Sequence, residues 1–227
     1  FKCFACGAGG DVIKFIQLRE NLSFAQAIGR LAERAGIKLE PMQTDSGRGQ
    51  EGPDPSQLAR VNAWVQKFWT ANLKNDQKGR TAREYIEQRK ITEESVQMWL
   101  LGYATESWDE LTNAAKAAGI SQKMLVEAGL GVVKNTGCYD KFRNRLMFPI
   151  VDATERVIGF GGRTLGDDPA KYMNSPATVL FDKSNCLYGL DKARHEIVAT
   201  GTAVVVEGYT DVIMGHQFGC KNLVAAL

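Results

Sequence analysis

A short apolar run that ends in two carboxylates constrains the fold of this chain more than any other feature. Residues 204–206 are three valines that predict a buried strand, with Glu207 at its carboxyl end and Gly208 opening a turn. Asp211 then falls in the first turn of a helix expected over 210–217, where a carboxylate favours the helix dipole. This order predicts an α/β unit, and such units bind ligands beyond the carboxyl ends of their strands.

Glu207 and Asp211 are the candidate catalytic residues of this unit. Two carboxylates that face one cleft supply the oxygen ligands that Mg²⁺ or Mn²⁺ takes, as phosphoryl and nucleotidyl transfer require. A strand-end glutamate and a helix-capping aspartate without metal explain these residues equally well. The rest of the chain has to decide between half of a metal site and a structural motif.

The amino-terminal end carries a second candidate metal motif. Cys3 and Cys6 lie three positions apart on a glycine-containing knuckle, so both sulfurs reach one tetrahedral Zn²⁺. Neither His195 nor His216 is close in sequence, so the other ligands are expected outside this chain, which starts at Phe1 and is interpreted as an internal fragment. A redox pair is the rival interpretation, disfavoured because no thioredoxin-like strand precedes the cysteines.

Composition limits the class of protein. The 227 residues allow one large or two modest domains, and 44% hydrophobic residues suffice for a soluble core. The formal net charge is only +2, so any affinity for nucleic acid must come from a local patch. No apolar run approaches the roughly 20 residues that cross a bilayer, so no membrane partner is expected. Five cysteines, two of them in metal spacing, predict a reducing interior and a cytoplasmic location.

Four segments are predicted along the chain. Residues 1–39 hold the cysteine pair and two amphipathic helices, over 11–20 and 24–35, and residues 40–53 form a linker rich in proline and glycine. Asp54 caps a long helix that runs to about Asn75. Its aromatic stripe is expected to be core, with base stacking as the alternative.

The next segment, 54–200, is expected to change from helices to strands. Strands are predicted over 146–151, 157–160 and 203–206, and Ser107 with Glu110 predicts a capping box. The predicted short helices span 81–88, 93–100, 108–118 and 122–128. With the α/β unit over 201–227, the fold class is α+β: a zinc-ribbon remnant, a mixed helical and β subdomain, and the start of an α/β domain.

Basic residues gather in the strand-rich part. Charge counting alone favours a solvated surface, because Asp140, Asp152 and Glu155 lie among them. The alternative is a phosphate-binding groove, in which the glycines of residues 159–162 let backbone amides approach closely. Those glycines lack the strand-to-helix setting of a dinucleotide fingerprint. The basic residues are Lys141, Arg143, Arg145, Arg156, Arg163, Lys171 and Lys183.

Taken in order, these motifs resemble the bacterial replicative DNA primase family of the DnaG type, which lays RNA primers on single-stranded template. Residues 3–15 (CFACGAGGDVIKF) look like the second half of that family's zinc ribbon. Residues 140–150 (DKFRNRLMFPI), 159–163 (GFGGR) and 171–176 (KYMNSP) look like the start of its RNA polymerase domain. Residues 207–211 (EGYTD) look like the first carboxylate motif of a Toprim fold, a catalytic module shared with topoisomerases.

The resemblance implies a DNA-directed RNA polymerase that joins ribonucleotides on single-stranded DNA by metal-dependent nucleotidyl transfer. Glu207 and Asp211 are then its catalytic Mg²⁺ or Mn²⁺ ligands, and Cys3 and Cys6 hold a structural Zn²⁺. Further catalytic acids are expected beyond Leu227, so this fragment alone is expected to polymerise nothing. The matching positions for binding nucleic acid and nucleotide are Arg145, Arg163, Lys171, Asn174 and Lys183.

The resemblance also implies partners and leaves two rival classes open. The expected partners are single-stranded DNA, ribonucleoside triphosphates, a replicative helicase bound through a domain absent here, and a single-strand-binding protein, all at the bacterial nucleoid. One rival is a zinc-dependent single-strand-binding module without catalysis. The other is a different Toprim enzyme, a topoisomerase or a nuclease. Tyr209, between the two carboxylates, is expected to be structural, which weakens the topoisomerase reading.

Overall fold

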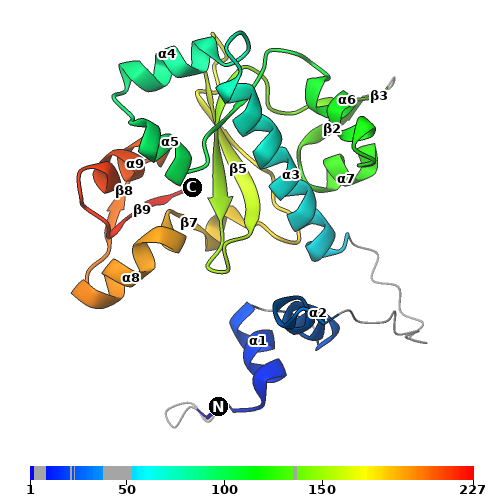
Figure 1. The fold of residues 1–227 in the computed structure, drawn as a ribbon, viewed down its shortest axis with the longest axis vertical. Coiled ribbons are helices and arrows are strands. Elements are labelled where there is room, and N and C mark those ends of the chain that lie inside the picture. The colour runs from blue at the N-terminus through cyan, green and yellow to red at the C-terminus, as the bar shows by residue number, and fades with distance from the viewer. Residues whose placement is uncertain (3–8, 21, 23, 38–52, 135–136) are drawn as a thin grey trace. The chain divides into compact units, whose positions relative to one another are not determined.

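The structure is a computed structural model that describes residues 1–2, 9–20, 22, 24–37, 53–134 and 137–227 (Figure 1). The chain divides into two compact units, Phe1–Gln50 and Glu51–Leu227, and the division falls within the predicted 40–53 linker. Most of that linker lies outside the described residues, as do Cys3 and Cys6.

The first unit contains two helices that pack on each other, α1 (Val12–Glu20) and α2 (Phe24–Ala35). Both match the predicted helices to within one residue. Gly36 follows α2 at φ 67°, a left-handed conformation that ends helices and that glycine adopts without strain.

The second unit begins with the long helix α3 (Pro55–Lys74), as predicted. Asp54 caps it, because its Oδ1 accepts a hydrogen bond from the Ser56 backbone N–H at 2.9 Å. Trp69 is buried and meets the rings of Phe142 and Phe160 edge-on, with centroids 5.8 and 4.8 Å away. Trp64 and Phe68 pack on the same core but are only partly buried, so the prediction that the aromatic stripe is core is confirmed for Trp69 and in part for the other two.

A four-stranded antiparallel sheet forms the centre of this unit, in the order β1-β4-β5-β6. Its side chains alternate between two cores. Met147 packs on the side of α3, which crosses the sheet, while Leu146 and Phe148 pack with Tyr209 and Val212 on the other side (Figure 1). The strands are β1 (Gly102–Ala104), β4 (Arg145–Val151), β5 (Val157–Thr164) and β6 (Tyr172–Asn174).

Short helices and a hairpin surround the sheet, and each predicted helix agrees with the structure to within two residues. The capping box predicted at Ser107 and Glu110 is wrong. Asp109 is the N-cap residue of α6 and makes no side-chain capping bond. Asp140 reaches the helix end from a neighbouring strand instead, and accepts hydrogen bonds from the N–H groups of Leu111 and Thr112 at 2.7 and 2.9 Å. The elements are α4 (Arg80–Gln88), α5 (Glu93–Met98), α6 (Glu110–Ala117), α7 (Gln122–Glu127), β2 (Gly131–Lys134) and β3 (Gly137–Asp140).

The carboxyl-terminal part is the predicted α/β unit. Strands β8 (Val204–Val206) and β9 (Leu223–Ala226) are parallel and connected by α9 (Tyr209–Gln217). The sheet order is β7-β9-β8, with β7 (Leu187–Tyr188) antiparallel to β9 and α8 (Leu190–Thr200) between β7 and β8.

The prediction that β8 is buried is wrong. Val204 is 41% exposed and Val205 is 62% exposed. Among the described strands β8 pairs only with β9, so it forms the edge of its sheet. Tyr209, Val212 and Ile213 nevertheless share one core with the central sheet, so this part does not form a core of its own. The predicted boundary at residue 200 stays a prediction. None of the helices in the described residues combines the length and apolarity that a membrane span requires.

Candidate nucleic-acid and metal site

A polar cleft of about 620 Å³ lies between α4 and the connection from β5 to β6. Tyr85 and Gln88 of α4 line one wall, and Arg163 and Lys171 line the other. The structure thus brings together two of the residues predicted to bind nucleic acid. The carboxylates Glu84, Asp167 and Asp168 also line the cleft.

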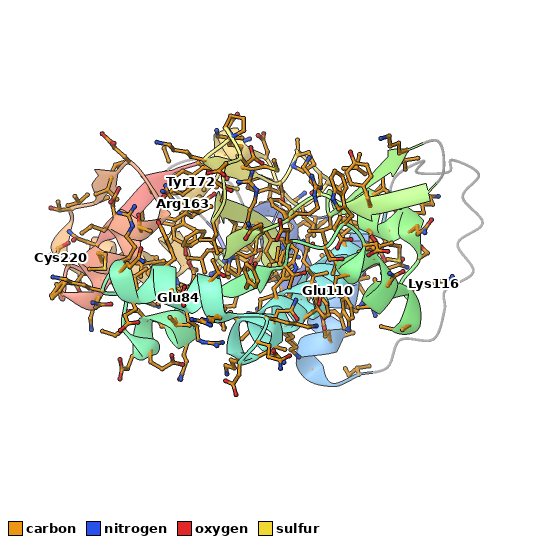
Figure 2. All side chains as sticks on the ribbon, turned by 90° about the horizontal axis from the view of Figure 1, so that it is seen from above. Glu84, Glu110, Lys116, Arg163, Tyr172 and Cys220 are labelled. Carbon is orange, nitrogen blue, oxygen red and sulfur yellow. The ribbon has the colours of Figure 1, made fainter. Side chains whose placement is uncertain are left out.

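The Arg163 side chain lies between aromatic rings rather than between carboxylates. Its Cζ is 5.5 Å from the centre of the Tyr85 ring and 5.0 Å from that of Tyr172. Figure 2 shows Arg163 and Tyr172 next to each other, on the side of the molecule that also carries Glu84. Within the described part of the chain Arg163 makes no ion pair, and its buried Nε has no hydrogen-bond partner. Its charge is therefore available to an anion in the cleft.

Arg145 has a different environment, and the prediction that it binds template directly is not supported by its geometry. Only 1% of its side chain is exposed. Its guanidinium donates hydrogen bonds to the backbone oxygens of Gly162 (3.2 Å) and Ala170 (2.9 Å) and to Asp168 Oδ2 (2.6 Å). The Ala170 backbone N–H and the charge of Arg145 hold the pKa of Asp168 below its ordinary value. Arg145 therefore fixes the loop beside the cleft, and its burial leaves almost none of its side chain accessible to a phosphate.

Asn174 connects the basic strands to the acidic motif. Its Oδ1 accepts a hydrogen bond from the Tyr209 hydroxyl at 2.6 Å. Tyr209 is the first residue of α9 and stacks on Phe148, with ring centroids 4.9 Å apart. Gly161 makes room for it, since a Cβ at that position would lie 2.2 Å from Tyr209 Cζ. Burial raises the pKa of Tyr209, as expected for a packed phenol. The prediction that Tyr209 is structural agrees with this packing.

Glu207 and Asp211 lie at the carboxyl end of β8 and in the first turn of α9, as predicted. Neither carboxylate has a hydrogen-bond or ion-pair partner among the described residues, so their oxygens are free to bind a cation. The described residues contain no group of three or more His, Cys, Asp or Glu side chains that fits a metal ion. The two carboxylates are thus at most part of a ligand set.

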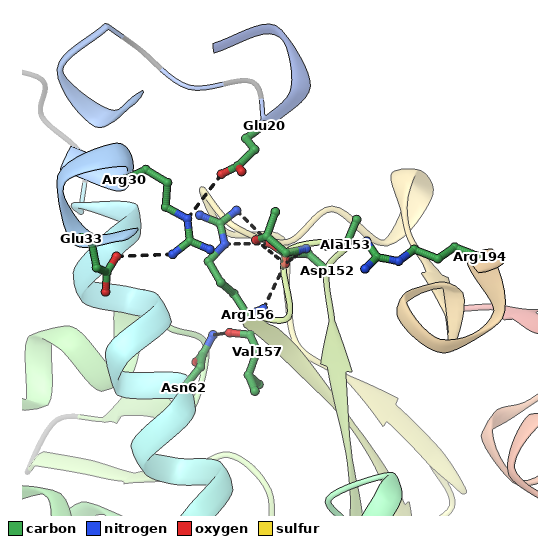
Figure 3. A network of polar contacts seen from close by, with 10 residues as sticks. Glu20, Arg30, Glu33, Asn62, Asp152, Ala153, Arg156, Val157 and Arg194 are labelled. Atoms are coloured by element: carbon green, nitrogen blue, oxygen red, sulfur yellow. Dashed lines mark hydrogen bonds and ion pairs between the residues drawn. The ribbon is translucent and has the colours of Figure 1, made fainter. Parts of the chain in front are cut away.

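Two other predicted basic residues lie away from the cleft. Lys183 is exposed at the start of the short 3-10 helix Lys183–Asn185 and is not among the residues that line the cleft. Arg156 pairs with Asp152 at 2.8 Å across the turn between β4 and β5, close to the point where Asn62 donates to the Val157 backbone oxygen at 3.1 Å (Figure 3). Arg156 therefore stabilises the hairpin.

Sequence reasoning missed the two aromatic partners of Arg163. Tyr172 pairs with Arg163 in the register of β5 and β6, but β6 has three residues, too few for the sequence to reveal that pairing. Tyr85 had no detectable signal either, because it comes from a helix 78 positions earlier in the chain.

Comparison with known proteins identifies the family. Residues 68–194 match the family described as DNA primase catalytic core, N-terminal domain, and residues 1–47 match the CHC2 zinc finger. The first of these covers more than half of the chain. The second supports zinc binding by the amino-terminal unit.

Individual relatives agree with both matches. A DNA primase of Deinococcus radiodurans is 42% identical over 229 residues, covering 100% of this chain and 38% of the relative. The RNA polymerase domain of Mycobacterium tuberculosis primase DnaG superposes with a TM-score of 0.73 at 36% identity, covering 76% of this chain and 57% of that one. A DnaG primase catalytic domain bound to single-stranded DNA gives a TM-score of 0.68 at 38% identity, covering 76% and 56%. The chain spans well under half the length of the curated relatives it matches. With its zinc finger, its mixed α and β fold and its catalytic-core match, the chain belongs to the DNA primase family.

Proposed function

We propose that this chain is the part of a DNA primase that binds single-stranded template and supplies the first carboxylates of the catalytic site. The observation that carries the proposal is the unpaired guanidinium of Arg163 in the cleft. Strand β6 pairs with the strand that carries Arg163, and its residue Asn174 is hydrogen-bonded to Tyr209 of α9, the helix that bears Asp211. A phosphate-binding cation and a carboxylate motif are thus connected through one rigid core.

The proposed template contacts come from the cleft wall. Arg163 and Lys171 neutralise backbone phosphates, which dominate affinity for nucleic acid. Lys183, exposed and outside the cleft, is a separate proposed phosphate contact. Asn174 is held by Tyr209 and presents its amide group to nucleotide or template. The relative that was solved with single-stranded DNA supports this choice of ligand.

The proposed catalytic site is built on the β8–α9 turn. Glu207 and Asp211 are the described residues that would hold Mg²⁺ or Mn²⁺, as part of a Toprim-type module. Bound there, such a metal neutralises charge on the phosphates of a ribonucleoside triphosphate. Cys3 and Cys6 are the proposed ligands of the structural Zn²⁺, in agreement with the zinc-finger match.

The wider role follows from the family. We propose that the protein synthesises RNA primers for DNA replication in the bacterial cytoplasm. Its further proposed partners are a replicative helicase and a single-strand-binding protein.

Primer synthesis by the full-length protein tests this function. Labelled ribonucleotides, single-stranded DNA and Mg²⁺ are supplied to the parent, to Glu207→Gln and to Glu196→Gln, a control carboxylate on α8 that forms no hydrogen bond or ion pair with Glu207 or Asp211 in the described residues. RNA products are expected from the parent and the control and not from Glu207→Gln. A parent that binds template but makes no RNA with any template or metal would support the non-catalytic binding module.

A further inference from the structure

Tyr85 is the one aromatic residue of the cleft wall that comes from α4. Two guanidinium groups lie within 6 Å of its ring centre, that of Arg163 at 5.5 Å and that of Arg89 at 5.2 Å. Both distances are within the range of cation–π attraction, which is stronger where the ring and the cation are shielded from water. The ring is partly buried against the core that contains Leu146 and Phe148, so its position is set by packing.

The hydroxyl group of Tyr85, unlike its ring, makes no polar contact with the described part of the chain. It is buried and has no hydrogen-bond partner among the described residues. A buried hydroxyl without a partner costs stability rather than adding to it. The ring is therefore the functional part of this side chain, and phenylalanine is its conservative replacement.

Arg163 needs a contact from outside its own strand to hold its side chain in one conformation. An arginine side chain loses about 2 kcal/mol of rotamer freedom when it is fixed. Other arginines in this unit are fixed by carboxylates, as Arg145 is by Asp168, or by backbone oxygens, as Arg83 is by Leu73 and Asn75. Arg163 has no carboxylate partner among the described residues, and its neighbour in the sheet register, Tyr172, is 42% exposed. Tyr85 supplies the second ring, from a helix outside the sheet.

We propose that Tyr85 is a positioning residue, whose ring holds the Arg163 guanidinium in the cleft, ready for a backbone phosphate of single-stranded nucleic acid. This inference rests on the proposed function of the cleft. It assigns to α4 an indirect part in template binding, exerted through Arg163.

A double-mutant cycle on template affinity tests the proposal. Binding of a fluorescent single-stranded oligonucleotide to the full-length protein is measured by anisotropy for the parent, Tyr85→Leu, Tyr85→Phe, Arg163→Met and the Tyr85→Leu/Arg163→Met double variant. Tyr85→Leu is expected to weaken binding about fivefold, and Tyr85→Phe to stay within about twofold of the parent. Arg163→Met is expected to weaken binding about tenfold. The double variant is expected to match Arg163→Met, because Tyr85 then has no guanidinium to position.

The outcomes separate this inference from the function on which it rests. Parent-like binding by Tyr85→Leu, or an equal loss from Tyr85→Leu with and without Arg163, overturns the positioning role and leaves template binding standing. Parent-like binding by Arg163→Met overturns template binding through the cleft itself. Urea unfolding checks that each variant folds. If Tyr85→Leu does not fold, Tyr85→Met, whose flexible side chain refills the volume, replaces it in the same cycle.

Discussion

Two arginines on the paired strands β4 and β5 have opposite environments. Arg145 is the centre of a polar knot, defined here as Arg145, Asp168 and the backbone oxygens of Gly162 and Ala170. Arg163 is the centre of an aromatic stack, defined here as Tyr85, Arg163 and Tyr172. In the knot the guanidinium is buried and donates three hydrogen bonds to the protein. In the stack the rings hold the group from its sides and leave its charge unpaired.

This difference shows how one sheet can hold one arginine that stabilises the fold and another that stays available to a ligand. The two residues are almost opposite each other, since Arg145 pairs with Thr164 and Leu146 pairs with Arg163. Alternation of side chains along the strands sends the two guanidiniums into different surroundings. A carboxylate partner and burial make Arg145 a stabilising residue. Aromatic partners orient Arg163 without neutralising it, as a phosphate-binding site requires.

The largest effect on stability is expected from breaking the knot. Arg145→Met removes three hydrogen bonds and takes the side-chain donor away from the Ala170 backbone oxygen, so we expect the free energy of unfolding to fall by about 2–4 kcal/mol. Arg163→Met removes no hydrogen bond, so the free energy of unfolding is expected to fall by less than about 1 kcal/mol. Urea unfolding of both variants gives the two values. Equal losses would mean that the knot and the stack do not differ as described.

A second test disturbs the packing that joins the stack to the acidic motif. Gly161→Ala places a Cβ 2.2 Å from Tyr209 Cζ, so the buried ring must move. We expect a loss of about 1–3 kcal/mol, together with weaker template binding. Gly159→Ala on the same strand is the matched control, because its Cβ would lie 3.1 Å from Phe181 and needs a smaller adjustment. A control that costs more than Gly161→Ala would contradict this account of Tyr209.

A smaller effect, with a distinct pH dependence, is expected at Asp140. In Asp140→Asn an amide nitrogen replaces one accepting oxygen at the start of α6, which costs on the order of 1 kcal/mol. Burial raises the pKa of Asp140 above its usual 3.8, against hydrogen bonds from Thr112 and Leu111 that lower it. A raised pKa in the folded state means that the stabilisation is complete below the usual value and is lost as pH rises through the folded pKa.

The difference in unfolding free energy between the parent and Asp140→Asn should therefore be largest below pH 3.8 and shrink as pH rises through the folded pKa of Asp140. The stabilisation that Asp168 contributes is expected to change with pH in the opposite direction. Its pKa is lowered, so its stabilisation is present above the usual 3.8 and is lost as pH falls through the folded pKa. Urea unfolding across pH for Asp140→Asn and Asp168→Asn shows both trends. Parallel trends in the two variants would contradict these assignments.

The comparison also shows what could be predicted from the sequence. Helix α3, strand β4, the first half of β5 and the β8–α9 turn were predicted from periodicity and caps, because those signals are local; the prediction of β5 ended at residue 160, four residues short of its end. Sequence reasoning grouped Arg145 with Arg163, since both are basic residues in one motif region. Only tertiary structure distinguishes them, through Asp168 in a loop and Tyr85 on a distant helix. The strands β2, β3, β6 and β7 have four residues or fewer, too few to show a period.

The exposure of β8 was not predicted because it, too, depends on tertiary neighbours. Three consecutive valines predict a strand, but burial depends on how many neighbours the strand has. Glu207 and Asp211 were placed correctly at its end, because a carboxylate after a strand and another in the first helical turn are local features. What binds these carboxylates was not visible in the sequence and remains the proposal made above.

The salt dependence of single-strand binding tests the central claim most directly. Affinity of the full-length protein for an oligonucleotide is measured over a series of salt concentrations for the parent, Arg163→Met and Lys116→Met, an exposed control on α6 that lies far from Arg163 in Figure 2. If Arg163 contacts a phosphate, its loss weakens binding and reduces the slope of log affinity against log salt by about 1, while Lys116→Met leaves the slope unchanged. Parent-like affinity and slope for Arg163→Met would contradict the claim that the aromatic stack presents a phosphate-binding cation.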